Sequence, residues 1–155
     1  MEKNTELIEV LNDLIQINND RLTGYEKASK ELSAADVDLK AIFSQMSAQS
    51  RKYTTELSAE VGRLGGEPST STTASGKIYR AWMDVKAVFT GKDRHAVLES
   101  CEYGEDAAQK AYDHALKTDA MLDTTTRQMI ANQKSELRTS HDTIKKYRDM
   151  HEIVK

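Results

Sequence analysis

The sequence predicts an all-α protein, a four-helix bundle built from two antiparallel hairpins. Apolar residues recur at alternating spacings of three and four through most of the chain, which is the pattern of helices that bury one face. The 155 residues include one proline and seven glycines, so few residues would break long helices. Residues that favour turns and helix ends gather at a few places. We expect one domain over residues 1–155.

The first hairpin is predicted from residues 4–32 and 36–64, and an apolar stripe runs the length of both segments. Residues 33–36 (Ser-Ala-Ala-Asp) fit a capping box that would start the second helix. Gly65 and Gly66 would end it, because glycine tolerates the left-handed backbone at a helix terminus. The short link makes the two helices antiparallel neighbours.

The second hairpin is predicted from helices over residues 94–117 and 124–153. Between the hairpins lie a polar stretch rich in hydroxyl groups, residues 67–75, and a shorter helix expected over residues 76–90. A long crossover between two hairpins is the ferritin-like arrangement, in which the second and third long helices run parallel. We therefore expect a ferritin-like bundle whose crossover contains a short helix.

Each apolar stripe turns polar near its middle. At a rise of about 1.5 Å per residue, counting from the helix ends places these interruptions at one height in the bundle. We expect a polar layer there, in which Arg51 neutralises a buried acid. The residues of this predicted layer are Asn18, Asp20, Gln49, Arg51, Glu102, Glu105 and His141. Tyrosines on the inward stripes, expected to direct their hydroxyls into the layer, are Tyr25, Tyr53, Tyr112 and Tyr147.

Two interpretations of this layer remain open. A di-iron or di-manganese carboxylate centre takes one Glu from each of two helices and Glu-x-x-His from each of the other two. In those positions the chain has Arg51-x-x-Thr54 and Arg138-x-x-His141, and an arginine cannot be deprotonated to bind a metal. We favour a structural layer of ion pairs and hydrogen bonds that fixes helix register. The alternative is an iron, manganese or zinc site. Its candidate ligands are Glu102, Glu105, His141, Asp20 and Gln49.

Several short motifs occur in order along the chain. They are Gly24-Tyr25-Glu26, Leu64-Gly-Gly-Glu-Pro68, Gly76-x-x-Tyr-Arg-x-Trp82, Cys101-Glu-x-Gly-Glu105 and His141-Asp142. As an ordered set they resemble an uncharacterised bacterial family of ferritin-like four-helix-bundle proteins, a domain of unknown function. The resemblance implies a ferritin-like fold and a stress-associated bacterial protein. It implies no reaction, because the family has no settled activity.

Composition argues against nucleic acid and membrane as partners and indicates a cellular compartment. The net charge is −3 and the charges of both signs are interspersed, so the chain lacks the basic patch of a nucleic-acid binder. No apolar run approaches about 18 residues, so we expect no membrane span. The first residues, MEKNTELIEV, lack the pattern of a signal peptide. The single cysteine, Cys101, fits a reducing compartment and is expected to be buried and inert. We expect a cytoplasmic protein.

The sequence favours a non-catalytic protein. No catalytic or cofactor-binding residue stands out, and we expect a structural or interaction role in bacterial stress physiology. The alternative is a degenerate carboxylate/His site with oxidoreductase or metal-storage activity. A third interpretation is a small pocket lined by the polar layer beneath the crossover helix. Ferritin-like bundles often pair, so a homodimer is the oligomer that we consider, and the sequence identifies no protein partner.

Overall fold

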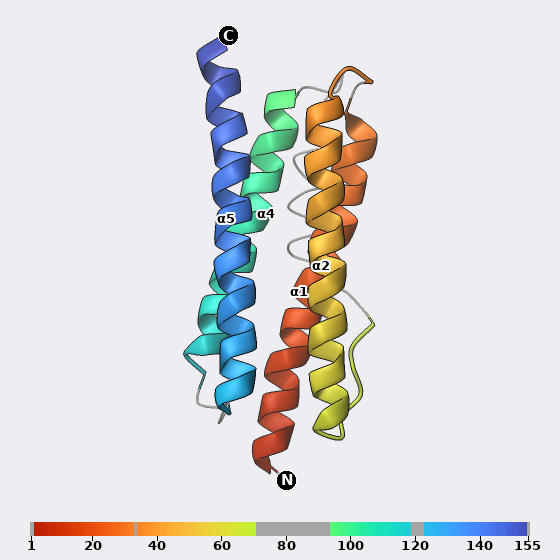
Figure 1. The fold of residues 1–155 in the computed structure, drawn as a ribbon, viewed down its shortest axis with the longest axis vertical. Helices are drawn as coiled ribbons and strands as arrows, with labels where there is room; N and C mark the ends of the chain where they lie inside the picture. The colour runs from red at the N-terminus through yellow and green to blue at the C-terminus, as the bar shows by residue number, and fades with distance from the viewer. Residues whose placement is uncertain (1, 33, 71–93, 119–122, 155) are drawn as a thin grey trace.

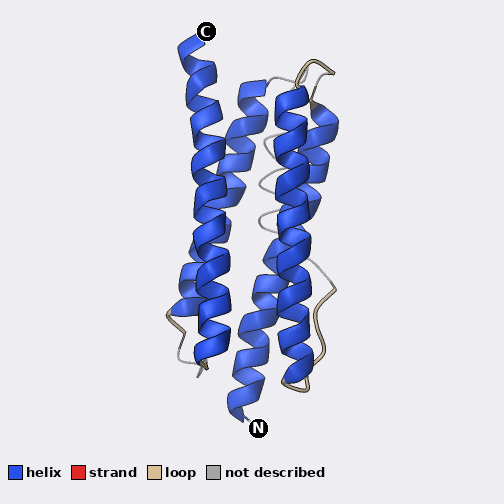
Figure 2. Ribbon diagram, in the orientation of Figure 1, coloured by secondary structure: helices blue, strands red, loops and turns tan. Residues whose placement is uncertain are grey.

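The computed structural model describes residues 2–32, 34–70, 94–118 and 123–154. Within these ranges the chain forms no strand and four helices, which are α1 (Glu2–Glu31), α2 (Val37–Arg63), α4 (Arg94–Leu116) and α5 (Thr124–Val154) (Figure 1, Figure 2). The all-α prediction is confirmed, and each long helix begins and ends close to the predicted residues. The short helix expected over residues 76–90 lies outside the described residues.

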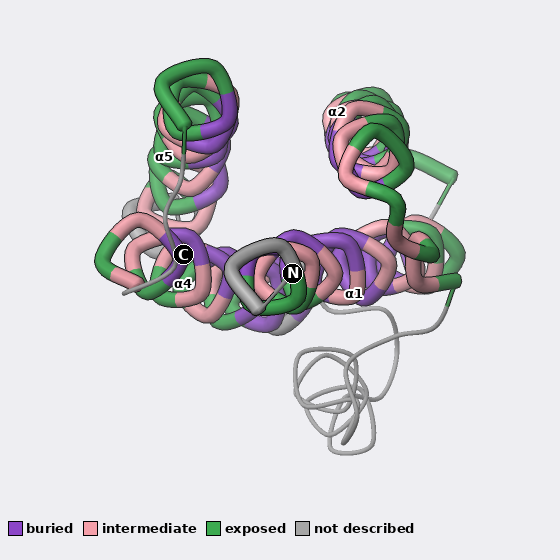
Figure 3. Tube along the Cα trace, turned by 90° about the horizontal axis from the view of Figure 1, so that it is seen from below, coloured by how far each residue is buried: buried purple, intermediate pink, exposed green. Residues whose placement is uncertain are grey.

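The helices run in the directions of a ferritin-like bundle. In Figure 1, α1 and α5 run upward while α2 and α4 run downward, so each hairpin is antiparallel and α2 is parallel to α4. The two hairpins meet mainly through α1 and α4, whereas the backbones of α2 and α5 come close to each other at few positions. The end-on view in Figure 3 shows α2 and α5 standing apart on the same side of the α1–α4 pair. The bundle is therefore least tightly closed between α2 and α5.

The start of α2 differs slightly from the expected capping box. Asp36 occupies the N-cap position itself. Helix α2 therefore begins at Val37. In a capping box the acidic residue is the third residue after the cap, whereas Asp36 is the cap itself. Ser33 lies outside the described residues.

The end of α2 is formed by the paired glycines, as predicted. Gly65 has a φ of +84°, a left-handed conformation that glycine adopts without the steric penalty of other residues. A Cβ atom on Gly66 would lie 2.8 Å from Cδ1 of Ile8, so the backbone passes close to α1 here. The next segment also lies on α1, because the Asn12 side chain donates to the carbonyl of Glu67 at 3.1 Å.

The apolar stripes of all four described helices form one core. Large side chains that are fully buried in it include Leu11, Phe43, Leu57, Leu98 and Ile130. Burying each such side chain contributes roughly 1.5–3 kcal/mol. Cys101 is also fully buried, and burial raises the pKa of its thiol well above the ordinary value. None of these four helices combines the length and the apolar character needed to cross a membrane.

Candidate functional site

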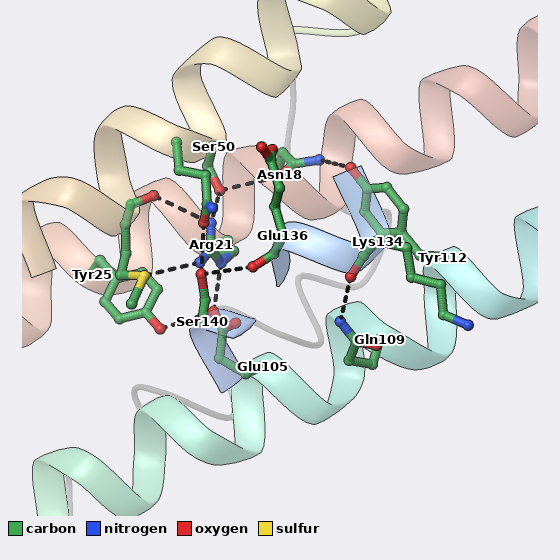
Figure 4. Close-up of polar contacts among 12 residues, drawn as sticks. Asn18, Arg21, Tyr25, Ser50, Glu105, Gln109, Tyr112, Lys134, Glu136 and Ser140 are labelled. Carbon is green, nitrogen blue, oxygen red and sulfur yellow. Dashed lines mark hydrogen bonds and ion pairs between the residues drawn. The ribbon is translucent and has the colours of Figure 1, made fainter. Parts of the chain in front are cut away.

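The centre of the bundle holds a buried cation. Arg21 of α1 is fully buried, and its Nε donates to Oε1 of Glu105 of α4 at 2.5 Å. Its Nη1 donates to Oγ of Ser50 at 2.8 Å and to the carbonyl of Met46 at 3.2 Å, both on α2. One guanidinium therefore joins three helices (Figure 4). Arginine suits this place because its planar fork presents five donors and remains charged.

The surroundings of Arg21 keep it protonated. Burial is the largest single influence and would lower the pKa of Arg21, but the charge of Glu105, its hydrogen bond and the nearby tyrosines together raise the pKa above its ordinary value. Tyr25 donates its hydroxyl to the same Oε1 of Glu105 at 2.8 Å. Burial, followed by the charge of Glu105, raises the pKa of Tyr25, so its hydroxyl stays a donor. Oε2 of Glu105 is buried and accepts no hydrogen bond from the described residues.

A head-to-tail chain of hydrogen bonds begins at Arg21. The Ser50 hydroxyl accepts from Arg21 and donates to Oδ1 of Asn18 at 3.1 Å. The Asn18 amide then donates to the hydroxyl of Tyr112 at 2.8 Å and to the carbonyl of Leu14 at 2.9 Å. Each group accepts from one neighbour and donates to the next, so the bonds polarise one another in the same direction.

The chain continues from Tyr112 to the carboxylate of Glu56. The Tyr112 hydroxyl donates to Oε1 of Gln133 at 2.6 Å, and Nε2 of Gln133 donates to Oε1 of Glu56 at 3.1 Å. Burial raises the pKa of Tyr112, which keeps this hydroxyl a donor. The chain therefore links a buried positive charge to a negative charge that is only partly buried.

Three hydrogen-bonded pairs join α2 and α5 in a row. These pairs, which we call the polar ladder, are Gln49–Ser140, Tyr53–Glu136 and Glu56–Gln133. Their bonds measure 3.0, 2.6 and 3.1 Å. Successive positions on each helix are four and three residues apart, which places them on one face. In most bundles apolar side chains occupy such positions, so polar side chains replace apolar ones along this part of the α2–α5 contact.

Two hollows lie between α2 and α5 beside the polar ladder. One has a volume of about 570 Å³ and the other about 340 Å³, and Glu136 lines both. We call the two together the α2–α5 groove. Most of the other lining side chains are amides or hydroxyls, among them Gln133 and Ser140. The pocket expected beneath the crossover helix cannot be compared with this groove, because residues 76–90 lie outside the described residues.

Several residues of the predicted polar layer lie in the bundle interior. Asn18, Asp20 and Glu105 are fully buried. Gln49 is half-buried and belongs to the polar ladder. Tyrosine hydroxyls also take part: those of Tyr25, Tyr53 and Tyr112 bond as described above, whereas Tyr147 is partly buried against the core.

Arg51 lies on the surface. Its side chain is 64 % exposed, and it pairs with Glu26 at 3.3 Å. The prediction that Arg51 neutralises a buried acid is therefore wrong. One residue of an α-helix turns the side chain by about 100°, so Arg51 points away from the centre that its neighbour Ser50 reaches. Arg21 has the predicted role instead.

Glu102 and His141 lie together, away from the partners of Glu105. Nε2 of His141 lies 2.6 Å from Oδ1 of Asp106, and one ligand-type atom from each of Glu102, Asp106 and His141 lies within 4.8 Å of the other two. Glu105 instead bonds to Arg21. The candidate ligands named from the sequence are thus divided between two places, and Asp106 was missed.

Signals for the two missed residues were present in the sequence. Arg21 stands on the apolar stripe of α1, where a charged residue requires a buried partner. Asp106 follows Glu102 by four residues, which puts both carboxylates on one helix face. Counting along the helices gave the height of the layer but not the side of each helix that faces inward.

A charged cluster joins the end of α2 to the start of α5. Oδ1 of Asp123 accepts from the backbone amide of Thr126 at 2.7 Å, and its Oδ2 lies 3.1 Å from Arg63, which also pairs with Glu60. The bond from the Thr126 amide is the main reason that the pKa of Asp123 is lowered from 3.8. The bond from Arg63 is the main cause that lowers the pKa of Glu60 from 4.5.

We expect the charge of Asp123 to stabilise the fold at neutral pH and to lose this effect in acid. A carboxylate with a lowered folded pKa stabilises above its unfolded pKa, and the stabilisation disappears as the pH falls through the folded pKa. The thermal midpoint of Asp123→Asn should therefore lie below that of wild type at neutral pH. The difference should shrink as the pH falls below 3.8. A difference that does not change between pH 7 and pH 2 contradicts this reasoning.

Comparisons with known proteins point to the same fold. A family model described as "Domain of unknown function (DUF2383)" matches residues 6–118. No curated protein sequence matches the chain. A Dps1 mutant from Mycobacterium smegmatis superposes with a TM-score of 0.81 at 14 % identity, over 95 % of this chain and 97 % of that one. A ferritin-like, diiron-carboxylate protein from Bacillus anthracis gives 0.69 at 16 % identity, over 97 % and 98 %. The predicted ferritin-like fold is confirmed.

Proposed function

We propose that this chain, which belongs to the DUF2383 family, a domain family of unknown function, is a non-catalytic ferritin-like bundle that acts through its surface. The observation that carries this proposal is the fully buried Arg21, ion-paired with Glu105. A guanidinium cannot ligate a metal and repels a divalent ion. It also engages Glu105, a carboxylate that a metal centre at this place would use. The Bacillus anthracis protein is described as a diiron-carboxylate protein. We do not propose a diiron centre for this chain.

The α2–α5 groove supports an interaction role. Its wall carries carboxylates and amides whose positions are fixed by buried donors, since Tyr53 bonds to Glu136 and Gln133 bonds to Glu56. A hollow with a fixed hydrogen-bonding pattern suits a partner segment rich in amide and hydroxyl groups. The partner that we propose is thus a polar segment of another protein in the cytoplasm.

We expect the purified protein to show no ferroxidase activity. With ferrous iron and oxygen supplied, iron oxidation should proceed at the rate of buffer alone, because Arg21 excludes a divalent ion from the bundle centre. Oxidation is followed by the absorbance of ferric products. The matched variants are Glu105→Gln and the surface change Glu26→Gln. Rapid oxidation in wild type and in Glu26→Gln that is lost in a folded Glu105→Gln protein would refute the proposal.

The place of the protein in bacterial stress physiology is also part of this proposal. It rests on the ordered motifs described above, from Gly24-Tyr25-Glu26 to His141-Asp142. Protein abundance in growing and in stressed cells tests it, and equal abundance in both contradicts it. Sedimentation of the purified chain tests whether it forms a homodimer.

A further inference from the structure

A second group of polar side chains, separate from the bundle centre, lies where α4 meets α5. Glu102 and Asp106 are four residues apart on α4, and His141 comes from α5. We call these three residues the α4–α5 cluster. We propose that it binds one divalent transition-metal ion of the zinc class, with water completing the coordination.

The composition of the cluster suits such an ion. One imidazole nitrogen and two carboxylate oxygens are ligands that zinc accepts, and three protein ligands leave a fourth position for water. An i, i+4 spacing on a helix presents two ligands to the same point. The third ligand comes from the neighbouring helix, so a bound ion would hold α4 and α5 together.

The distances require only small side-chain adjustments. The three ligand atoms lie within 4.8 Å of one another, and Nε2 of His141 is already 2.6 Å from Oδ1 of Asp106. Ligand atoms around a tetrahedral zinc with bonds of about 2.1 Å are separated by about 3.4 Å. Glu102 and His141 are mostly shielded from solvent, with side chains 15 % and 16 % exposed. The Asp106 side chain is 54 % exposed, so the cluster is open to solvent on that side, where water can reach a bound ion.

Supporting residues orient two of the three ligands. Nδ1 of His141 lies 3.2 Å from Oδ1 of Asp142, so a carboxylate holds the ring nitrogen that does not face the cluster. A histidine ligand to zinc usually has such a partner on its other nitrogen, which fixes the ring and its tautomer. Arg138 lies 3.6 Å from the same oxygen of Asp142. On the other flank, Arg148 pairs with Oε2 of Glu102.

The charge balance still attracts a cation. Arg148 offsets the charge of Glu102, but Arg148 also pairs with Asp149 at 2.9 Å. Asp106 then supplies a negative charge directly at His141. The competing arrangement is a simple His141–Asp106 ion pair, which would need neither Glu102 nor a metal.

The experiment is a titration of the full-length protein with zinc, measured by calorimetry and by thermal unfolding. We expect one zinc ion per chain and a rise in the thermal midpoint with zinc in excess, because the ion binds the folded form. His141→Ala and Asp106→Asn should each weaken binding by at least tenfold. Asp142→Asn should weaken it by about 10–100-fold through loss of the ring partner.

The matched control is His95→Ala on α4, the helix that carries Glu102 and Asp106. His95 pairs with Glu99 at 3.5 Å and belongs to no group of three ligand-type side chains among the described residues. This variant should bind zinc as wild type does. Unchanged thermal midpoints without zinc would establish that the variants fold. Wild-type affinity in a folded His141→Ala protein, or an equal loss in His95→Ala, overturns the proposal.

Discussion

Replacing Arg21 with methionine is expected to destabilise the protein by about 3–5 kcal/mol, because Glu105 would stay buried without its ion-pair partner. The change also removes the donor to Ser50 and to the carbonyl of Met46. Urea unfolding followed by circular dichroism measures the difference. Methionine keeps most of the volume of the arginine stem, so the loss reports charge and hydrogen bonding more than packing.

Two further variants make this test specific. The double change Arg21→Met with Glu105→Leu should recover much of the lost stability, since an apolar pair can replace a buried ion pair at little loss. Arg51→Leu should change the free energy of unfolding by less than about 0.5 kcal/mol, because exposed ion pairs contribute little. A folded Arg21→Met protein as stable as wild type would mean that Glu105 does not need the guanidinium.

Replacing Phe43 with alanine is the second change with a large expected effect, about 3–5 kcal/mol of lost stability. Phe43 is fully buried, and its ring centre lies 5.3 Å from that of Tyr25. Arg21 lies on the same tyrosine ring at 5.1 Å. Removing Phe43 therefore opens a cavity beside the residue whose hydroxyl bonds to Glu105.

A double-variant cycle with Tyr25→Phe separates packing from hydrogen bonding. If the Phe43 ring holds the Tyr25 hydroxyl in place, the stability losses of Phe43→Ala and Tyr25→Phe should not add. Tyr103→Ala is the control, since Tyr103 is an aromatic residue on α4 that is 61 % exposed, and it should change stability little. Additive losses would mean that Phe43 does not position Tyr25.

The long helices could be predicted because their apolar stripes repeat over many turns. The stripes of α1 and α2 include Leu11 and Phe43, both fully buried. The residues of the polar layer are harder to predict, because an apolar stripe shows the average direction of the buried face but not the direction of each side chain. The height of Arg51 along the helix predicts that it reaches the centre, but Ser50, one residue earlier, is the side chain that does so.

The α4–α5 cluster illustrates a different limit. The distances of Glu102, Glu105 and His141 from their helix ends predict one height in the bundle for all three. Helix rotation separates them, since Glu105 bonds to Arg21 while His141 contacts Asp106. Which neighbour each face meets depends on how the two hairpins dock, and one sequence contains no direct record of that angle.

The polar ladder joins α2 and α5 through hydrogen bonds that other polar groups can replace. Each rung is a hydrogen bond between side chains of α2 and α5, and such a bond contributes a net of only about 0.5–1.5 kcal/mol. Water or another polar group can replace one of these bonds with little change in free energy, whereas α1 and α4 are joined by buried apolar side chains and by the fully buried Arg21–Glu105 ion pair. The two hairpins are therefore held more firmly along the α1–α4 contact than along the α2–α5 contact, where hydrogen bonds can be exchanged.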